Sequence, residues 1–198
     1  VDTASSLARV INQTDCPPKL VVWVSSTGVY GEHKGAWVDE QTPATPTTFS
    51  GRALLSAEQA ITRSVSDTII VRFSGIYGPG RLALIAGVQK GVGKPPSPKR
   101  WTNRIHSEVC AGFLTYLIRQ KIAGASLEAL YIGSDNEPVT QHDIRVWLAQ
   151  KLGVTLVEEA ISKNTFSPPN RRFDNKRLRK SGYKLQYTTF REGYIPLL

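Results

Sequence analysis

Apolar residues are distributed along this chain in two alternating patterns. Short runs rich in β-branched residues, which are typical of strands buried on both faces of a sheet, occur at 20–25, 68–73 and 129–133. Apolar residues spaced three and four positions apart, which predict helices, occupy 4–11, 52–65, 82–90, 108–122 and 140–153. Because strands and helices alternate, we expect an α/β fold whose mostly parallel sheet is covered by helices on both faces.

The segments that follow the first two strands are candidates for a ligand site. In open parallel sheets, ligands bind beyond the carboxyl ends of the strands. Here these ends lead into residues 25–31 and 73–81, both of which are rich in Ser, Gly and Tyr. The two segments therefore predict a binding site at one edge of the sheet.

Other parts of the chain have weaker patterns. The stretch after Gly91 contains Gly93 and three prolines, so it is predicted to form a loop. The C-terminal part is predicted to hold a short strand at 155–159 and a basic helix at 175–180, with a break at two consecutive prolines between them.

Composition narrows the class of protein. A chain of 198 residues that is 40% hydrophobic can bury one sizeable core, which favours one domain or one domain with a small lobe. No apolar run approaches the roughly 20 residues that a membrane-spanning helix needs, and the start lacks a signal-peptide pattern. We therefore expect a soluble, cytoplasmic protein without membrane association. Neither Cys16 and Cys110 nor the three histidines have a metal-binding spacing, so we expect no metal site.

The formal net charge is +9, and much of the excess lies at 94–104 and 171–184. This charge allows three interpretations: a solvated basic face, a general affinity for polyanions, or a site for a ligand that carries phosphate. Because the chain carries no recognition motif and no aromatic residues interleaved with basic ones, we do not expect nucleic-acid binding.

Four motifs in order along the chain carry a resemblance to a known family. Residues 24–31, Val-Ser-Ser-Thr-Gly-Val-Tyr-Gly, resemble the strand, serine and Val-Tyr-Gly signature of extended short-chain dehydrogenase/reductases. Residues 72–81 resemble the loop beneath the nicotinamide, and 103–106 resemble a substrate-lobe segment. The segment 177–183 is similar to the closing segment of the atypical branch. The chain thus resembles an atypical extended member of the NAD-dependent epimerase/dehydratase family.

The resemblance implies a fold, a cofactor and a class of substrate. It implies the C-terminal part of a Rossmann-type doubly wound parallel sheet over 1–92, and a substrate lobe with returning Rossmann elements over 93–198. It also implies NAD or NADP as cofactor, and hydride transfer to or from a sugar nucleotide or a related carbonyl or alcohol. A small-molecule substrate is the expected partner, and a homodimer is compatible with the pattern.

The resemblance also assigns roles to residues at both strand ends. Ser26 matches the family's hydroxyl that positions a substrate oxygen, with Thr27 beside it, unless both hydroxyls only cap the strand end. Tyr30 is a candidate replacement acid, unless it packs as part of the Val-Tyr-Gly motif. The predicted catalytic residues are Ser26, Thr27 and Tyr30, and the predicted cofactor-binding residues are Ser25, Phe73, Ser74, Gly75 and Ile76.

Basic residues after the second strand are predicted to bind the substrate. Arg81, Arg100 and Arg104 are candidate phosphate contacts, because a guanidinium makes paired bonds to phosphate oxygens. His106 is expected either to face the substrate or to anchor its loop to the following helix.

The chain departs from the family pattern at three places. One follows His106, where the family usually has an aspartate three positions on and this chain has Val109. Ser50 and Leu54 stand where the catalytic tyrosine and lysine are expected, and neither can replace them. No glycine-rich phosphate-binding turn occurs in the sequence, so we expect a truncated member. These departures predict impaired catalysis, and they leave open a non-catalytic dinucleotide sensor or scaffold.

Overall fold

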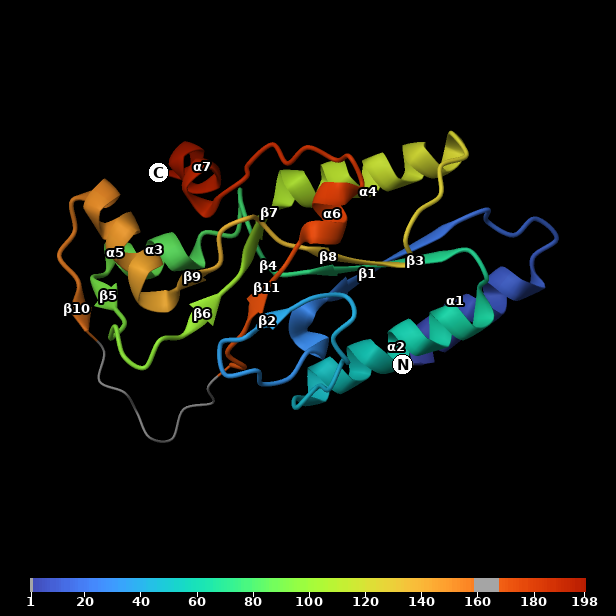
Figure 1. Ribbon diagram of the computed structural model, residues 1–198, viewed down its shortest axis with the longest axis horizontal. Coiled ribbons are helices and arrows are strands. Elements are labelled where there is room, and N and C mark those ends of the chain that lie inside the picture. The colour runs from blue at the N-terminus through green and yellow to red at the C-terminus, as the bar shows by residue number, and fades with distance from the viewer. Residues whose placement is uncertain (1, 159–167) are drawn as a thin grey trace.

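A parallel sheet of three strands lies at the centre of the computed structural model, which describes residues 2–158 and 168–198 (Figure 1). The strands, in spatial order, are β1 (Val21–Ser26), β3 (Thr68–Phe73) and β8 (Leu130–Gly133). In the register, Ser26 pairs with Phe73 and Phe73 pairs with Gly133. The carboxyl ends of all three strands therefore lie side by side at one edge.

Helices cover both faces of this sheet, as the sequence predicts (Figure 1). The helices α1 (Asp2–Gln13) and α2 (Phe49–Ser64) lie on one face. The other face is covered by α4 (Ser107–Ile122) and the short basic helix α6 (Lys176–Lys180). This arrangement confirms the predicted doubly wound α/β fold.

The helix ends follow local capping chemistry. Thr48 caps α2 by accepting a hydrogen bond from the Gly51 N–H, so the helix begins three residues before the predicted start. Thr140 caps α5 (Gln141–Leu152), and Gly153 ends it with a φ of 66°. A left-handed residue at this position favours glycine, which is why the apolar period stops there.

A second group of elements surrounds α5, at the end of the molecule away from α1 (Figure 1). It includes the helices α3 (Ala83–Gln89) and α7 (Phe190–Tyr194) and the 3-10 turn η2 (Ile195–Leu197), which continues α7. Another 3-10 turn, η1 (Thr27–Val29), follows β1. The short strands outside the main sheet form four pairs: β2 (Trp37–Val38) with β11 (Arg172–Phe173), β4 (Gly75–Tyr77) with β7 (Arg104–His106), β5 (Val92–Gly93) with β10 (Val157–Glu158), and β6 (Trp101–Thr102) with β9 (Val139–Thr140).

Two short strands correct the predicted loop after Gly91. β5 falls inside this glycine- and proline-rich stretch, and β6 begins three residues after its last proline, Pro98. Each pairs with a segment far away in sequence, so tertiary pairing overrides the weak local pattern. The predicted strand at 155–159 is β10, although Glu159 lies outside the described residues.

The core is divided between the two faces of the sheet. Val71 and Phe73 pack against Phe113 and Leu117 of α4, whereas Ile61 of α2 packs against Ala4 and Ala8 on the opposite face. On the outer side of the described sheet, β1 has no neighbouring strand, and Val24 is 50% exposed there. Among the described residues, helices cover both faces of the sheet, and β1 and β8 are its two outer strands.

The end of β8 can accommodate only glycine at position 133. A Cβ atom there would lie 2.2 Å from Cδ1 of Phe73, whose ring is fixed in the core. We expect Gly133→Ala to lower the free energy of unfolding by about 1–3 kcal/mol, because overpacking displaces the ring. Urea unfolding measures this. The control is Gly87→Ala on α3, where a Cβ meets nothing closer than 3.6 Å. Equal unfolding midpoints for the two variants would contradict the expectation.

Candidate functional site

Ser26 lies at the carboxyl end of β1, and its hydroxyl accepts one hydrogen bond from within the chain. Its Oγ accepts a hydrogen bond of 3.1 Å from the Gly28 N–H and so caps η1. The side chain is half-buried, and its hydroxyl proton has no acceptor among the described residues. Thr27 beside it is buried. The Ser26 hydroxyl can therefore cap the turn and still donate a hydrogen bond to a ligand.

Ser25 points to the opposite side of the strand. Its hydroxyl donates a 2.5 Å hydrogen bond to Oε1 of Glu58, and both side chains are buried. The predicted contact between Ser25 and the cofactor therefore competes with this bond. Of the two neighbouring serines, only Ser26 is open to a ligand in this arrangement.

Glu58 forms a buried ion pair with Arg72. The Arg72 Nη2–Glu58 Oε2 distance is 2.6 Å, and Nε of Arg72 also donates to both carboxylate oxygens. The two residues are only 4% and 7% exposed. Burial alone would lower the pKa of Arg72, but the bonds and charge of Glu58 outweigh it and raise that pKa above its usual value. The pair thus joins α2 to β3.

Tyr30 is tied into the same network. Its hydroxyl accepts a 2.8 Å hydrogen bond from Nη1 of Arg72 and donates to the Asp39 carbonyl at 3.1 Å. Burial raises its pKa, although the Arg72 charge opposes the shift. The ring is fully buried and packs against Phe173. These contacts favour the packing interpretation of Tyr30 over its predicted role as a replacement acid.

The predicted cofactor loop is buried at one end and exposed at the other. Phe73 belongs to the core, and the Ser74 hydroxyl contacts that of Ser134 at 3.2 Å. Gly75 is exposed and Ile76 is half-buried. Since Ser26 pairs with Phe73, a ligand at the sheet edge can reach Ser26 and Gly75 together.

The four predicted substrate residues differ in accessibility. Arg81 is exposed, and Arg100 is half-buried. Arg104, also half-buried, pairs with Gly75 across β4 and β7, which brings it next to the cofactor loop. His106 is only 2% exposed; its Nδ1 accepts from the Glu108 N–H and caps α4. This cap matches the anchoring alternative, and burial lowers the pKa of His106 despite the nearby Glu108 charge, which favours a neutral ring.

The positions expected for the catalytic tyrosine and lysine carry no equivalent group. Ser50 is exposed on the first turn of α2, with its Oγ 3.3 Å from the Thr48 hydroxyl. Leu54 is half-buried and packs against the cluster that contains Tyr30. Neighbouring Arg52 donates to the Thr47 carbonyl. None of these side chains can exchange a proton near neutral pH.

Sequence reasoning missed a buried polar cluster behind the strand ends. Asp135, just after β8, is 2% exposed, and its Oδ2 has no hydrogen-bond partner among the described residues. Burial raises the pKa of Asp135 to about 8, although Arg104 opposes the shift. Tyr77 stacks on Tyr194 with ring centroids 4.2 Å apart, and the charge of Asp135 reaches Tyr77. The one available signal was the position of Asp135 at the same sheet edge.

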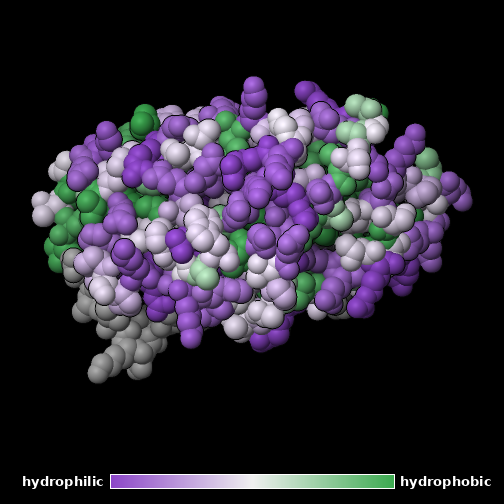
Figure 2. All heavy atoms as spheres, viewed as in Figure 1, coloured by the Kyte–Doolittle hydropathy of each residue, from purple (hydrophilic) through white to green (hydrophobic). Residues whose placement is uncertain are grey.

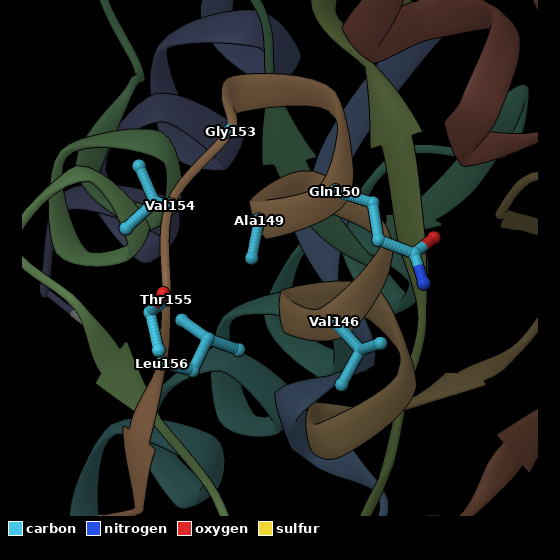
Figure 3. A pocket seen from close by; sticks show the side chains of 7 residues that line it. All are labelled: Val146, Ala149, Gln150, Gly153, Val154, Thr155 and Leu156. Carbon is cyan, nitrogen blue, oxygen red and sulfur yellow. The ribbon is translucent and has the colours of Figure 1, made fainter.

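A shallow groove of about 360 Å³ lies elsewhere, between α5 and the segment leading to β10 (Figure 3). Val146 and Ala149 face Leu156 across it, and Figure 2 shows apolar residues gathering at this end of the molecule. The groove contains none of the predicted site residues. Its other lining residues are Gln150, Gly153, Val154 and Thr155.

The described part of the chain offers neither a metal-binding cluster nor a membrane-spanning helix. Within residues 2–158 and 168–198, no group of His, Cys, Asp or Glu side chains is arranged to hold a metal ion. No helix in the same ranges is long and apolar enough to cross a membrane.

The strand ends fit one end of a dinucleotide better than the other. The nicotinamide end is a flat ring that needs few polar contacts. The Ser26 hydroxyl can donate one hydrogen bond there, and the exposed Gly75 leaves room for the ring. The pyrophosphate end needs a row of free N–H groups from a glycine-rich turn, and the sequence contains no such turn. The residues present therefore fit the nicotinamide and not the pyrophosphate.

Comparisons with known proteins place this chain in context. A family model described as the RmlD substrate binding domain matches residues 1–194. A protein from Methylobacillus flagellatus, assigned to the NAD-dependent epimerase/dehydratases, is 41% identical, with a TM-score of 0.78 over 91% of this chain and 64% of its own. A functionally unknown conserved protein from Silicibacter pomeroyi DSS is 30% identical, with a TM-score of 0.83 over 98% of this chain and 71% of its own.

More distant structures share the fold. MoeE5 in complex with UDP-glucuronic acid and NAD is 18% identical, with a TM-score of 0.78 over 98% of this chain and 67% of its own. A comparison with curated proteins found no match. The chain spans 64% of the length of the Methylobacillus flagellatus protein, which is less than two-thirds.

The ion pair behind Ser25 is expected to contribute strongly to stability. Glu58→Gln leaves the buried Arg72 guanidinium without a counter-charge, so we expect a loss of about 3–5 kcal/mol in unfolding free energy. Denaturant unfolding checks this. The control is Asp67→Asn, which removes an exposed 2.7 Å pair with Lys121 and is expected to cost at most about 1 kcal/mol. Similar losses for both variants would refute the distinction between buried and exposed pairs.

Proposed function

We propose that this chain, which belongs to the RmlD substrate binding domain family, binds NAD or NADP together with a sugar nucleotide or a related carbonyl or alcohol. Its membership agrees with the resemblance to atypical extended short-chain dehydrogenase/reductases. The reaction is hydride transfer, of the epimerase, dehydratase or reductase type. A bound nicotinamide supplies or accepts the hydride. The absence of the tyrosine and lysine predicts that this form performs the reaction poorly.

One observation carries the proposal: a hydroxyl with a free proton at the end of a central parallel strand. Ser26 donates to no described residue, and it lies in register with Phe73, two residues before the exposed Gly75. A hydroxyl in this place can hold a substrate carbonyl or alcohol oxygen by one hydrogen bond while a flat ring lies over Gly75.

Arg104 and Arg81 support the choice of a phosphate-bearing substrate. Arg104 pairs with Gly75 in the β4–β7 ladder, and its Nη1 donates to the Thr102 hydroxyl at 2.5 Å, so the guanidinium is held close to the cofactor loop. Arg81 follows the same loop and is exposed. In this proposal the two guanidinium groups bind the phosphate oxygens of a sugar nucleotide.

A second candidate function is a non-catalytic dinucleotide sensor or scaffold. Ser50 and Leu54 occupy the positions of the proton-exchanging pair, and Tyr30 is held by Arg72 and Asp39. A protein with this arrangement can bind a dinucleotide while lacking the group that moves the proton. The two candidates share the binding site and differ in turnover.

Binding is tested by titrating the protein with NADPH and NADH and following nucleotide fluorescence. We expect a saturable change in nucleotide fluorescence. With nucleotide bound, we expect Ser26→Ala to weaken the affinity for UDP-glucuronic acid by roughly 3- to 10-fold, which is the contribution of one hydrogen bond. The control is Ser56→Ala on the exposed side of α2, which is expected to bind like the wild type. No fluorescence change with either nucleotide would overturn the proposed function.

Turnover is tested by restoring the missing pair. We expect Ser50→Tyr combined with Leu54→Lys to raise the rate of NAD reduction with UDP-glucuronic acid by at least about 100-fold, the usual effect of a positioned acid or base. The single variants are the controls, because the tyrosine needs the lysine charge. Measurable wild-type turnover at the rate of the double variant would exclude the sensor interpretation.

A further inference from the structure

The turn after β1 is packed tightly on its α2 side. A Cβ on Gly31 would lie 2.4 Å from the Thr45 carbonyl oxygen, and one on Gly51 would lie 2.6 Å from the Gly28 carbonyl oxygen. These backbones approach so closely that only glycine fits at both positions. The turn 27–31 therefore rests on a rigid surface formed by α2 and the segment before it.

Arg171 holds the same turn through its carbonyl groups. Its Nη2 donates to the Thr27 carbonyl at 2.9 Å and its Nη1 donates to the Gly31 carbonyl at 3.2 Å. The side chain is 8% exposed, and its guanidinium lies 5.3 Å from the centre of the Phe173 ring. One planar group thus joins the two ends of the turn that follows Ser26.

The backbone on either side of Arg171 is itself fixed by the substrate lobe. Asn103 donates from Nδ2 to the Arg171 carbonyl at 3.0 Å and accepts at Oδ1 from the Phe173 N–H at 2.8 Å. Hydrogen bonds therefore connect the segment 103–104 through Arg171 to the turn after β1. This connection is one of the contacts that join the two predicted parts of the site.

The guanidinium of Arg171 has no acidic partner. It forms no salt bridge with any carboxylate in the part of the chain that the structure describes, and its Nε has no hydrogen-bond partner there. Burial lowers the pKa of Arg171, which the more distant Glu32 charge opposes. Burying an unpaired cation destabilises a fold. Among the described residues, the two carbonyl bonds and the Phe173 ring are the groups in direct contact with this guanidinium.

We propose that Arg171 is a positioning residue for the candidate site, holding the turn 27–31 so that the Ser26 hydroxyl points at the ligand. For the ligand, this inference rests on the proposed function. A guanidinium suits the task because its planar fork presents parallel N–H groups to two acceptors at once. A lysine ammonium can reach one carbonyl group and leaves the other without a donor.

The experiment compares Arg171→Ala and Arg171→Lys with the wild type. The matched control is Arg172→Ala, because Arg172 is the adjacent arginine and lies between the Trp37 and Trp101 rings, 4.9 and 4.7 Å from their centres. Three quantities are measured: NADPH and NADH affinity by fluorescence, amide hydrogen exchange of 26–31, and the thermal unfolding midpoint. Guanidinium chloride at low concentration, with sodium chloride as its control, tests chemical rescue of Arg171→Ala.

We expect Arg171→Ala to weaken nucleotide affinity by roughly 10- to 100-fold, as for other residues that orient a ligand-contacting group. Exchange should rise in 27–31 and stay unchanged in β3 and α4. The nucleotide affinity of Arg171→Lys should lie between those of Arg171→Ala and the wild type. Guanidinium chloride should restore part of the affinity of Arg171→Ala. Arg172→Ala should bind the nucleotides within about 2-fold of the wild type.

Other outcomes overturn the inference. Unchanged affinity, unchanged exchange in 27–31, or exchange that rises equally throughout β3 and α4 would each show that Arg171 does not position the turn. If the wild type binds neither nucleotide, the proposed function fails, and the exchange of 27–31 alone decides whether Arg171 holds the turn.

Discussion

The arrangement of the site depends on one buried ion pair, between Glu58 and Arg72. It draws together four elements: α2, which carries Glu58; β3, which carries Arg72; the end of β1, through Ser25; and the turn that carries Tyr30. Because both charged groups are buried, each compensates the charge of the other. If either side chain moved away, it would leave its partner as an unpaired buried charge. The pair occupies the face to which Ser25 points, and Ser26 lies on the opposite face of the strand end.

The parts of the fold with a local cause could be predicted from the sequence. The three central strands and the long helices follow from the apolar period, and the ends of α5 follow from Thr140 and Gly153. The short strands β5 and β6 could not be predicted, because each exists only through a partner tens of residues away. The same limit applies to Arg171, whose role depends on carbonyl groups about 140 residues earlier.

The site was predictable in place more than in detail. The serine pair lies at the carboxyl end of a central strand, as the sequence predicts, but which hydroxyl stays open depends on the alternation of the strand and on Glu58, which is distant in sequence. His106 shows the same difficulty, since a histidine that caps a helix and one that faces a ligand look alike in a sequence. Asp135 had only its location to identify it, because burial rather than residue type gives that carboxyl its raised pKa.

The outer side of β1 is a place where this sheet can be extended. Among the described strands β1 pairs only with β3, so its outer N–H and C=O groups can pair with a further strand, from the same protein or from another molecule. Such a strand would meet a chain that carries a formal net charge of +9. Added salt screens that charge over distances of about 10 Å at 0.1 M and leaves the hydrogen-bonding groups of the strand unchanged. Ionic strength is therefore a condition that changes how readily a charged segment approaches β1.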